Sequence, residues 1–204
     1  EVVADCDLSS LRHFVCGASP VPPSLIHLYD QKGFKIAQVY GATEYSGAIT
    51  FWTHDLGLDK CASAGKPVFH GQVRVCQPGG DEELAVGEVG ELCLYGPQVF
   101  LGYWQNPKAS QEVLKNGCYR SGDLGLVDED GCVYVVDRLK DMIISGGENI
   151  YPAEVEAVLQ KHPSIAEVAV AGRPDQKWGE VPVAFVVLKP GQTASEEDIL
   201  QACR

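Results

Sequence analysis

The sequence lacks long apolar runs and an excess of basic residues. No run of about 18 or more apolar residues is present, which argues against a membrane-spanning helix, and the segment from Glu1 has no signal-peptide pattern. Proteins that bind nucleic acid or anionic membranes need a basic face, whereas the formal net charge here is -12 at pH 7. We therefore expect no integral membrane segment and no nucleic-acid partner, and we interpret the acidity as a source of solubility.

The eight cysteines lack the spacings of metal sites. No two of them form a CxxC pair, and no group of cysteines and histidines has the spacing of zinc ligands. Several lie in apolar, strand-like stretches, such as Cys93 between Leu92 and Leu94. This pattern is typical of buried, reduced thiols, so we expect a cytoplasmic protein. The sequence also has no internal repeat and no low-complexity tract.

The first 60 residues have the pattern of an α/β unit. A strand is predicted over residues 11–16, a helix over residues 24–31 and a second strand over residues 35–39. A strand, a helix and a strand in this order predict a parallel pair, and ligands of such sheets bind beyond the carboxyl ends of the strands. We interpret this segment as the remnant of a larger α/β domain.

Residues 61–136 predict a β-rich, barrel-like subdomain. Short apolar runs recur in it, over residues 72–76, 91–95, 119–121, 124–127 and 133–136. Turns separate these runs, and Asp130-Gly131 is a hairpin signal. We expect a helix over residues 106–114, and we expect Tyr103 and Trp104 to pack in the core or on the rim of the sheet.

Residues 137–204 predict a small α+β domain that follows a charged joint. A strand over residues 142–144 is followed by the pair Gly146-Gly147 and by a helix over residues 152–161, whose first residue is Pro152. Two further strands, over residues 165–171 and 181–188, flank a polar loop that carries Trp178. Ser195 opens the last helix, with Asp198 in a capping-box position. Because the sequence stops soon afterwards, we expect this domain to be incomplete.

The end of the second strand carries side chains suited to a nucleotide and its metal ion. Tyr40 offers a flat face for a base, and Gly41 and Ala42 allow backbone N–H groups to approach a phosphate. Thr43 supplies a hydroxyl, and Glu44 supplies a hard oxygen ligand for magnesium (Mg2+). The alternative is a surface turn with an incidental carboxylate, and spacing alone does not decide between the two.

Two more residues have a functional interpretation beside a structural one. Asp123, which follows Gly122 at a strand end, is well placed to accept hydrogen bonds from two sugar hydroxyls, but it can also cap a turn. Trp178 can stack on a base, but it can also pack against its own loop.

Five motifs, in this order, resemble those of the adenylate-forming superfamily of acyl-CoA synthetases, luciferases and peptide-synthetase adenylation domains. They are Gly17-Ala18-Ser19-Pro20, which resembles a GGAP turn, residues 40–44 (YGxTE), residues 90–104 (GEL…GYW), residues 119–123 (YRTGD, with Ser121 for Thr) and residues 137–156, which resemble the long motif across the domain hinge. The resemblance covers nearly the whole chain. It implies that residues 1–60 are the end of a large AMP-binding domain.

The resemblance also implies a role for each matching position in the nucleotide site. Tyr40 would stack on the adenine, in a pocket lined by Gly17, Ala18 and Gly41. Thr43 would contact the α-phosphate and Glu44 would hold Mg2+. Asp123 would bind the ribose hydroxyls, with Arg138 beside it.

For the small domain, the resemblance implies a hinge and a path for coenzyme A. Lys140 would be the residue about which this domain turns. Ser145, Gly146 and Gly147 would lie along the pantetheine channel, and Trp178 would also contact CoA.

The activity implied is that of an ATP-dependent acyl-CoA ligase, with ATP, Mg2+ and CoA as cofactors and a small carboxylic acid as substrate. Residues 143–152 are similar to free-standing acyl- or aryl-CoA ligases, and Ile144 stands where luciferases carry a Lys. The acid is left open between fatty-acid metabolism and aromatic acids, and so is the oligomeric state. The alternatives are a carrier-protein acyl ligase and a non-catalytic nucleotide-binding or scaffold module.

Two parts of the family pattern are not in this sequence: the Ser/Thr/Gly-rich phosphate loop and the Lys near the C-terminus. We therefore expect the chain to be the middle and most of the end of an enzyme, and to be unable to adenylate a substrate by itself.

Overall fold

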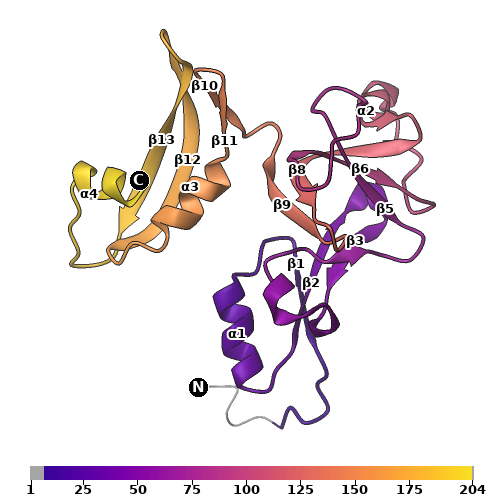
Figure 1. Ribbon diagram of the computed structural model, residues 1–204, viewed down its shortest axis with the longest axis horizontal. Helices are drawn as coiled ribbons and strands as arrows, with labels where there is room; N and C mark the ends of the chain where they lie inside the picture. The colour runs from indigo at the N-terminus through magenta and orange to yellow at the C-terminus, as the bar shows by residue number, and fades with distance from the viewer. Residues whose placement is uncertain (1–6, 204) are drawn as a thin grey trace. The chain divides into compact units, whose positions relative to one another are not determined.

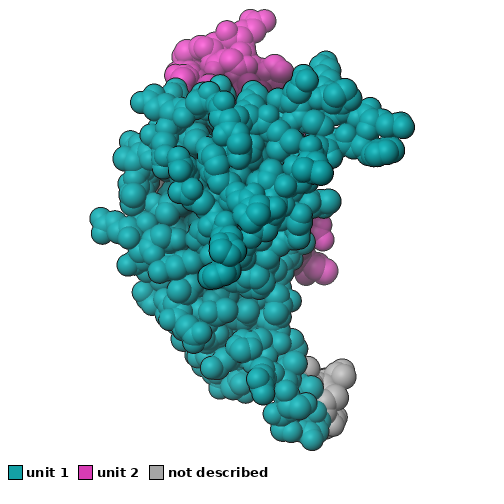
Figure 2. Space-filling view, turned by 90° about the vertical axis from the view of Figure 1, so that its right-hand side faces the viewer, with its two compact units in different colours: residues 1–121, 125–135 teal, residues 122–124, 136–204 magenta. Residues whose placement is uncertain are grey.

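The computed structural model describes residues 7–203 (Figure 1). It divides into two units: unit 1 comprises residues 1–121 and 125–135, and unit 2 comprises residues 122–124 and 136–204, with the terminal residues 1–6 and 204 outside the description (Figure 2). The fold is mixed α/β and its sheets predominate over its helices, which confirms the predicted fold class. No helix within residues 7–203 has the length and apolar character needed to cross a membrane.

The first sheet of unit 1 has four strands in the order β1-β2-β3-β4. These strands are β1 (Phe14–Gly17), β2 (Ile36–Ala42), β3 (Gly47–Trp52) and β4 (Lys66–Pro67). β1 and β2 are parallel, with Gly17 opposite Val39, so the predicted parallel pair is confirmed. Helix α1 (Pro23–Gln31) connects them and buries Ile26 against Ile36 and Trp52. Short 3-10 turns follow β2 and β3: η2 (Thr43–Tyr45), η3 (His54–Leu56) and η4 (Leu58–Lys60).

The second sheet has five strands, β5 to β9, in the order β5-β6-β8-β7 with β9 beside β8. Their bounds are β5 (Gln72–Cys76), β6 (Gly90–Tyr95), β7 (Leu114–Lys115), β8 (Cys118–Val127) and β9 (Val133–Arg138). Helix α2 (Pro107–Val113) is capped by Asn106, whose side-chain oxygen accepts a bond from Ala109 N at 3.1 Å. The prediction of separate strands over 119–121 and 124–127 is wrong, because Gly122, with φ 69°, continues the strand instead of ending it.

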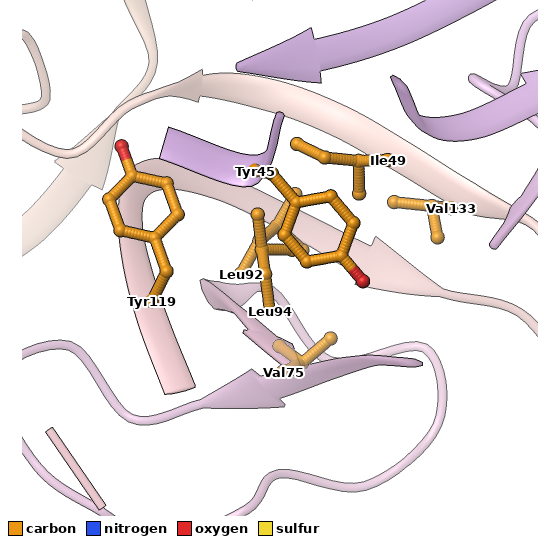
Figure 3. Close-up of a cluster of buried hydrophobic side chains, with 7 residues drawn as sticks. All are labelled: Tyr45, Ile49, Val75, Leu92, Leu94, Tyr119 and Val133. Carbon is orange, nitrogen blue, oxygen red and sulfur yellow. The ribbon is translucent and has the colours of Figure 1, made fainter. Parts of the chain in front are cut away.

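A buried apolar cluster joins the two sheets of unit 1 (Figure 3). Its members are Tyr45, Ile49, Val75, Leu92, Leu94, Tyr119 and Val133. The polar tip of Tyr45 is satisfied, since its hydroxyl donates to Tyr95 O at 2.7 Å. Truncating a fully buried leucine such as Leu92 to alanine costs about 2–5 kcal/mol in comparable cores. The expectation that Trp104 packs in or around this core is wrong, because its side chain is 90% exposed.

Unit 2 contains an antiparallel sheet in the order β11-β10-β13-β12. Its strands are β10 (Ile143–Ser145), β11 (Glu148–Ile150), β12 (Ile165–Asp175) and β13 (Gly179–Leu188), and its helices are α3 (Pro152–Leu159) and α4 (Glu196–Ala202). β10 and β11 do not share a sheet with β6. The predicted polar loop over residues 173–180 is largely strand, because β12 and β13 stay paired up to Asp175 opposite Gly179.

The glycine pair is a hairpin turn instead of a direct lead into a helix. Ser145 pairs with Glu148, so Gly146 and Gly147 are the two central residues of the turn between β10 and β11. Their φ angles are 59° and 89°, and a two-residue hairpin turn of type I′ needs positive φ at both positions. The positive φ angles of this turn are therefore sufficient to explain why both positions are glycine.

The helix starts in unit 2 follow the sequence signals. Pro152 is the first residue of α3, and Asp137 Oδ2 accepts a bond from Ala153 N at 3.0 Å. At α4, Ser195 Oγ accepts from Asp198 N and Asp198 Oδ2 accepts from Ser195 N, so the predicted capping box is confirmed.

Most of the described cysteines are buried and all are free. Cys76, Cys93 and Cys118 form one buried cluster, and Cys61 and Cys132 are buried elsewhere. Their burial confirms the prediction of buried cysteines at these positions, while their reduced state stays a prediction. Cys203 is exposed, Cys16 is half-buried, and Cys6 lies outside the described residues.

Candidate active site

The end of β2 and the turn after it carry the residues predicted to bind a base, a phosphate and a cation. Tyr40 is half-buried and packs against the core cluster, while Thr43 is exposed at the start of η2. Gly41 has a structural reason to lack a side chain, because a Cβ there would lie 2.4 Å from Gly47 O of β3. The same place shows a register shift, between Tyr40 and Gly41. The glycine is thus required by the close approach of β3, whether or not a phosphate binds beside it.

Glu44 is held through its backbone and its side chain. Its Oε1 accepts a hydrogen bond of 2.7 Å from the Tyr103 hydroxyl, and its carbonyl oxygen accepts a bond of 2.8 Å from Phe100 N. The hydrogen bond to Glu44, aided by partial burial, raises the pKa of Tyr103 to about 12. Sequence reasoning assigned Tyr103 to packing, and no local pattern marks a contact between residues this far apart in the chain.

The β1 turn lies beside this segment because parallel strands bring their carboxyl ends to one edge of a sheet. Gly17 lies against Val39, and a Cβ at Gly17 would be 2.5 Å from Val39 Cγ1. Ala18 follows with φ 67°, a left-handed conformation that a glycine adopts more easily. Unit 1 therefore places Gly17 and Ala18 next to the strand end that carries Tyr40.

Asp123 and Arg138 form an ion pair within unit 2. Arg138 Nε lies 2.8 Å from Asp123 Oδ1, and the side chains are 58% and 12% exposed, respectively. β8 and β9, which carry them, are hydrogen-bonded neighbours. The pairing places the exposed guanidinium of Arg138 beside the buried carboxylate of Asp123, as the resemblance implied.

Arg120, inside the same motif as Asp123, belongs to the framework. Its side chain is buried, and its Nε donates to Glu91 Oε2 at 2.9 Å. Its terminal nitrogens donate to Asp81 Oδ1 at 3.2 Å and to the carbonyl oxygens of Gln77 and Gly80. This network fixes the strand that leads to Asp123, and sequence reasoning gave Arg120 no role.

The residues predicted to meet coenzyme A come together in unit 2. Gly146 N donates to Trp178 O at 2.8 Å, and Ser145 pairs with Gly179. A Cβ on Gly146 would lie 2.6 Å from Trp178 Cε3, so the indole ring packs directly on the turn. Trp178 is 48% exposed, and Lys177 Nζ lies over its ring, 4.5 Å from the centroid. Trp178 therefore packs against the turn and remains about half exposed.

Lys140 is exposed in the turn between β9 and β10. The turn is closed by a bond from Asp141 N to Arg138 O at 3.0 Å. Leu139 N donates to Gly122 O at 2.8 Å, which ties the residue before Lys140 to β8.

The predicted residues are thus grouped by unit. Gly17, Ala18, Tyr40, Gly41, Thr43 and Glu44 are in unit 1, and Asp123, Arg138, Lys140, Ser145, Gly146, Gly147 and Trp178 are in unit 2. Within residues 7–203, no group of three or more His, Cys, Asp or Glu side chains can hold a metal ion. A single carboxylate such as Glu44 nevertheless fits Mg2+, which binds through one or two carboxylates together with substrate phosphates and water.

Comparisons with known proteins define the class to which this arrangement belongs. Residues 2–104 match the model of the AMP-binding enzyme family, and residues 154–204 match the model of the AMP-binding enzyme C-terminal domain. The chain therefore belongs to the family of AMP-binding enzymes.

Its relatives include acyl-CoA ligases with named substrates. Feruloyl-CoA synthase of an Amycolatopsis species is 47% identical over 194 residues, covering 95% of this chain and 39% of the relative. A 2-succinylbenzoate–CoA ligase of Bacillus cereus (strain Q1) is 46% identical over 195 residues, covering 96% of this chain and 40% of the relative. The chain thus spans about two fifths of the length of these curated relatives.

A solved relative is similar over the same range. It is the o-succinylbenzoate CoA synthetase of Bacillus subtilis in complex with its acyl-adenylate intermediate, with a TM-score of 0.88, 39% identity, and coverage of 95% of this chain and 39% of that chain. The same synthetase has also been solved in complex with ATP and a magnesium ion.

Proposed function

We propose that this chain is part of an ATP-dependent acyl-CoA ligase. The complete enzyme joins a carboxylic acid to AMP with release of pyrophosphate, and then transfers the acyl group from the adenylate to the thiol of CoA. The observation that carries the proposal is the likeness, over 95% of the chain, to a CoA synthetase solved with its acyl-adenylate. We propose that the 204 residues alone do not catalyse adenylation.

In the first half-reaction, unit 1 supplies the proposed base and phosphate contacts. Tyr40 offers its ring to the adenine beside the Gly17-Ala18 turn, and the exposed hydroxyl of Thr43 donates to the α-phosphate. Glu44 is the residue proposed to hold Mg2+, which would supply charge stabilisation at the phosphates. The fixed position of Glu44 supports this assignment, because the carboxylate is oriented before a ligand arrives.

Asp123 is proposed to bind the ribose hydroxyls of the nucleotide. One of its oxygens, Oδ1, meets Arg138 at 2.8 Å. The guanidinium of Arg138 faces this carboxylate, and an ionised acceptor makes stronger hydrogen bonds with hydroxyl groups than a neutral one.

In the second half-reaction, the small domain is proposed to turn about Lys140 and to bring the β10–β11 turn to the adenylate. Ser145, Gly146 and Gly147 then lie along the pantetheine arm, and the exposed part of Trp178 contacts CoA. The exposed position of Lys140 in a turn supports a pivot. We also propose the domain limits 1–60, 61–136 and 137–204.

We propose an aromatic carboxylic acid as the acyl substrate. Both curated relatives described above are named for aromatic acids, feruloyl and 2-succinylbenzoyl. Fatty-acid metabolism, the other expectation from the sequence, has no support among them.

The test is Asp123→Ala in the full-length ligase that contains this stretch. Loss of an anionic acceptor costs about 1.5–3 kcal/mol per hydrogen bond, so kcat/KM for ATP in pyrophosphate release should fall roughly 10- to 100-fold. Glu129→Ala, which removes an exposed acid from the β8–β9 turn, is the matched control and should leave this value unchanged. An unaltered kcat/KM in Asp123→Ala would refute the ribose assignment.

A further inference from the structure

We infer that Tyr103 is a positioning residue that presents Glu44 to the cation, an inference that rests on the function proposed above. The Tyr103 hydroxyl donates to Glu44 Oε1 at 2.7 Å. The second oxygen, Oε2, has no hydrogen-bond partner within residues 7–203. The contact therefore fixes one oxygen of the carboxylate and leaves the other to accept a ligand.

Tyr103 is itself held in place, as a positioning residue must be. Its backbone N–H donates to Ser110 Oγ at 2.8 Å, and Ser110 Oγ donates to Asn106 O at 2.9 Å. Gly102 has φ 139°, and a Cβ there would lie 2.9 Å from Ser110 Oγ. The missing side chain at Gly102 is thus what allows the start of α2 to approach Tyr103 closely.

The same loop also grips the backbone of Glu44. Phe100 N donates to Glu44 O at 2.8 Å, and the Phe100 ring meets the Tyr103 ring edge-to-face at 4.9 Å between centroids. Phe100 in turn meets Tyr119 of the core cluster at 5.8 Å. Glu44 is therefore fixed at two points by residues 100–103, which are braced against the core.

The chemistry of the donor suits a cation site. A neutral hydroxyl orients the carboxylate without neutralising it, whereas a Lys or Arg partner would compete with a metal ion for its charge. No Lys, Arg or His within the described part of the chain pairs with Glu44. Outer-shell partners of this kind change metal affinity by about 10- to 100-fold when removed.

The experiment is Tyr103→Phe in the full-length ligase, which keeps the ring and its contact with Phe100 but removes the hydroxyl. The Mg2+ concentration that gives half-maximal pyrophosphate release should rise about tenfold. Thioester formation from preformed acyl-adenylate, which uses no Mg2+ in the proposed reaction, should stay within about twofold of the parent value. Tyr29→Phe is the matched control, because its hydroxyl has no hydrogen-bond partner in the described residues, and it should change neither value.

The possible outcomes distinguish a failure of the role inferred for Tyr103 from a failure of the proposed metal ligand Glu44. An unchanged Mg2+ dependence in Tyr103→Phe, or an equal loss in both half-reactions, would overturn the positioning role. Glu44→Gln tests the proposed cation ligand directly: if it leaves the Mg2+ dependence unchanged, the metal assignment fails. If Glu44→Gln alone raises the Mg2+ requirement and Tyr103→Phe does not, only the inference about Tyr103 fails. In the Glu44→Gln background, Tyr103→Phe should have no further effect on Mg2+ dependence.

Discussion

Trp178 packs on the turn formed by Gly146 and Gly147. We therefore expect the effect of Gly146→Asn on the stability of the hairpin to change sign when Trp178 is removed. Type I′ hairpin turns favour Asn at the first central position, so Gly146→Asn should stabilise such a turn by about 0.4–1 kcal/mol through the unfolded state. In this chain, however, a Cβ at Gly146 would lie 2.6 Å from Trp178 Cε3 and 3.0 Å from Cζ3. Overpacking of this kind costs about 1–3 kcal/mol.

The net effect in the parent chain should therefore be destabilising. Trp178 is 48% exposed and its ring can move outward, which places the expected clash in the lower half of that range, at about 1.5–2 kcal/mol. We expect Gly146→Asn to destabilise the β10–β11 hairpin by roughly 1 kcal/mol. In the Trp178→Ala background the same change should be neutral or stabilising, which gives a coupling energy of about 1–2 kcal/mol.

Amide hydrogen exchange by mass spectrometry, read over β10 to β13, measures the opening free energy of this sheet without interference from unit 1. The four chains of the cycle are the parent, each single variant and the double variant. Trp104→Ala is the matched control, since it removes an exposed tryptophan from unit 1 and should not couple to Gly146. If Gly146→Asn has the same effect with and without Trp178, the packing argument is wrong.

Three further predictions concern other parts of the chain. Ala18→Gly should raise the urea midpoint of unit 1 by the equivalent of about 0.5 kcal/mol, because relief of the left-handed alanine exceeds the added chain entropy; a lower midpoint would contradict this. Burial would raise the pKa of Asp128, but bonds from Lys60 and Cys132 N lower it overall, so Asp128 stabilises the fold only while it is ionised. Asp128→Asn should therefore lower the urea midpoint at pH 7, and the difference from the parent chain should shrink as the pH falls below about 4 and through the lowered pKa of Asp128; a difference at pH 2 as large as that at pH 7 would refute the linkage. In the full-length ligase, Lys140→Pro should leave adenylate formation intact and slow thioester formation steeply, and equal losses in single-turnover assays of the two steps would exclude a pivot.

Local signals in the sequence predicted local structure well. Ser195 and Asp198 are three residues apart and cap the same helix, and β5 has the bounds predicted for it. The capping box depends on four consecutive residues only, and β5 is marked by its own short apolar run, so both could be predicted from the local sequence.

The errors arose where local chemistry allows two outcomes. A glycine such as Gly122 often ends a strand. A glycine with positive φ can also lie within a strand when its neighbours are paired on both sides. Residues 173–180 are polar, yet the β12–β13 register carries pairing through Pro174 and Glu180. Tertiary pairing overrode composition in both cases.

The site was predictable as a set of residue types and less so as a set of contacts. Asp123 and Arg138 were expected to be neighbours, and Arg138 Nε lies 2.8 Å from Asp123 Oδ1. Their role in binding a nucleotide stays a prediction. The bond between Tyr103 and Glu44 joins residues that are 59 positions apart, and no periodicity or spacing links them.

The close approach of β3 to Gly41 affects how the motif of residues 40–44 can change in evolution. A Cβ at this position would lie 2.4 Å from a carbonyl oxygen of β3, so the hairpin itself excludes every other residue. A descendant gene that had lost the reaction would still need glycine here in order to fold. Thr43 is exposed and Glu44 makes one side-chain hydrogen bond, to Tyr103, so both can change at less cost to the fold than Gly41. An inactive paralogue should therefore be recognised by changes at Thr43 and Glu44 and not at Gly41, which lies within β2.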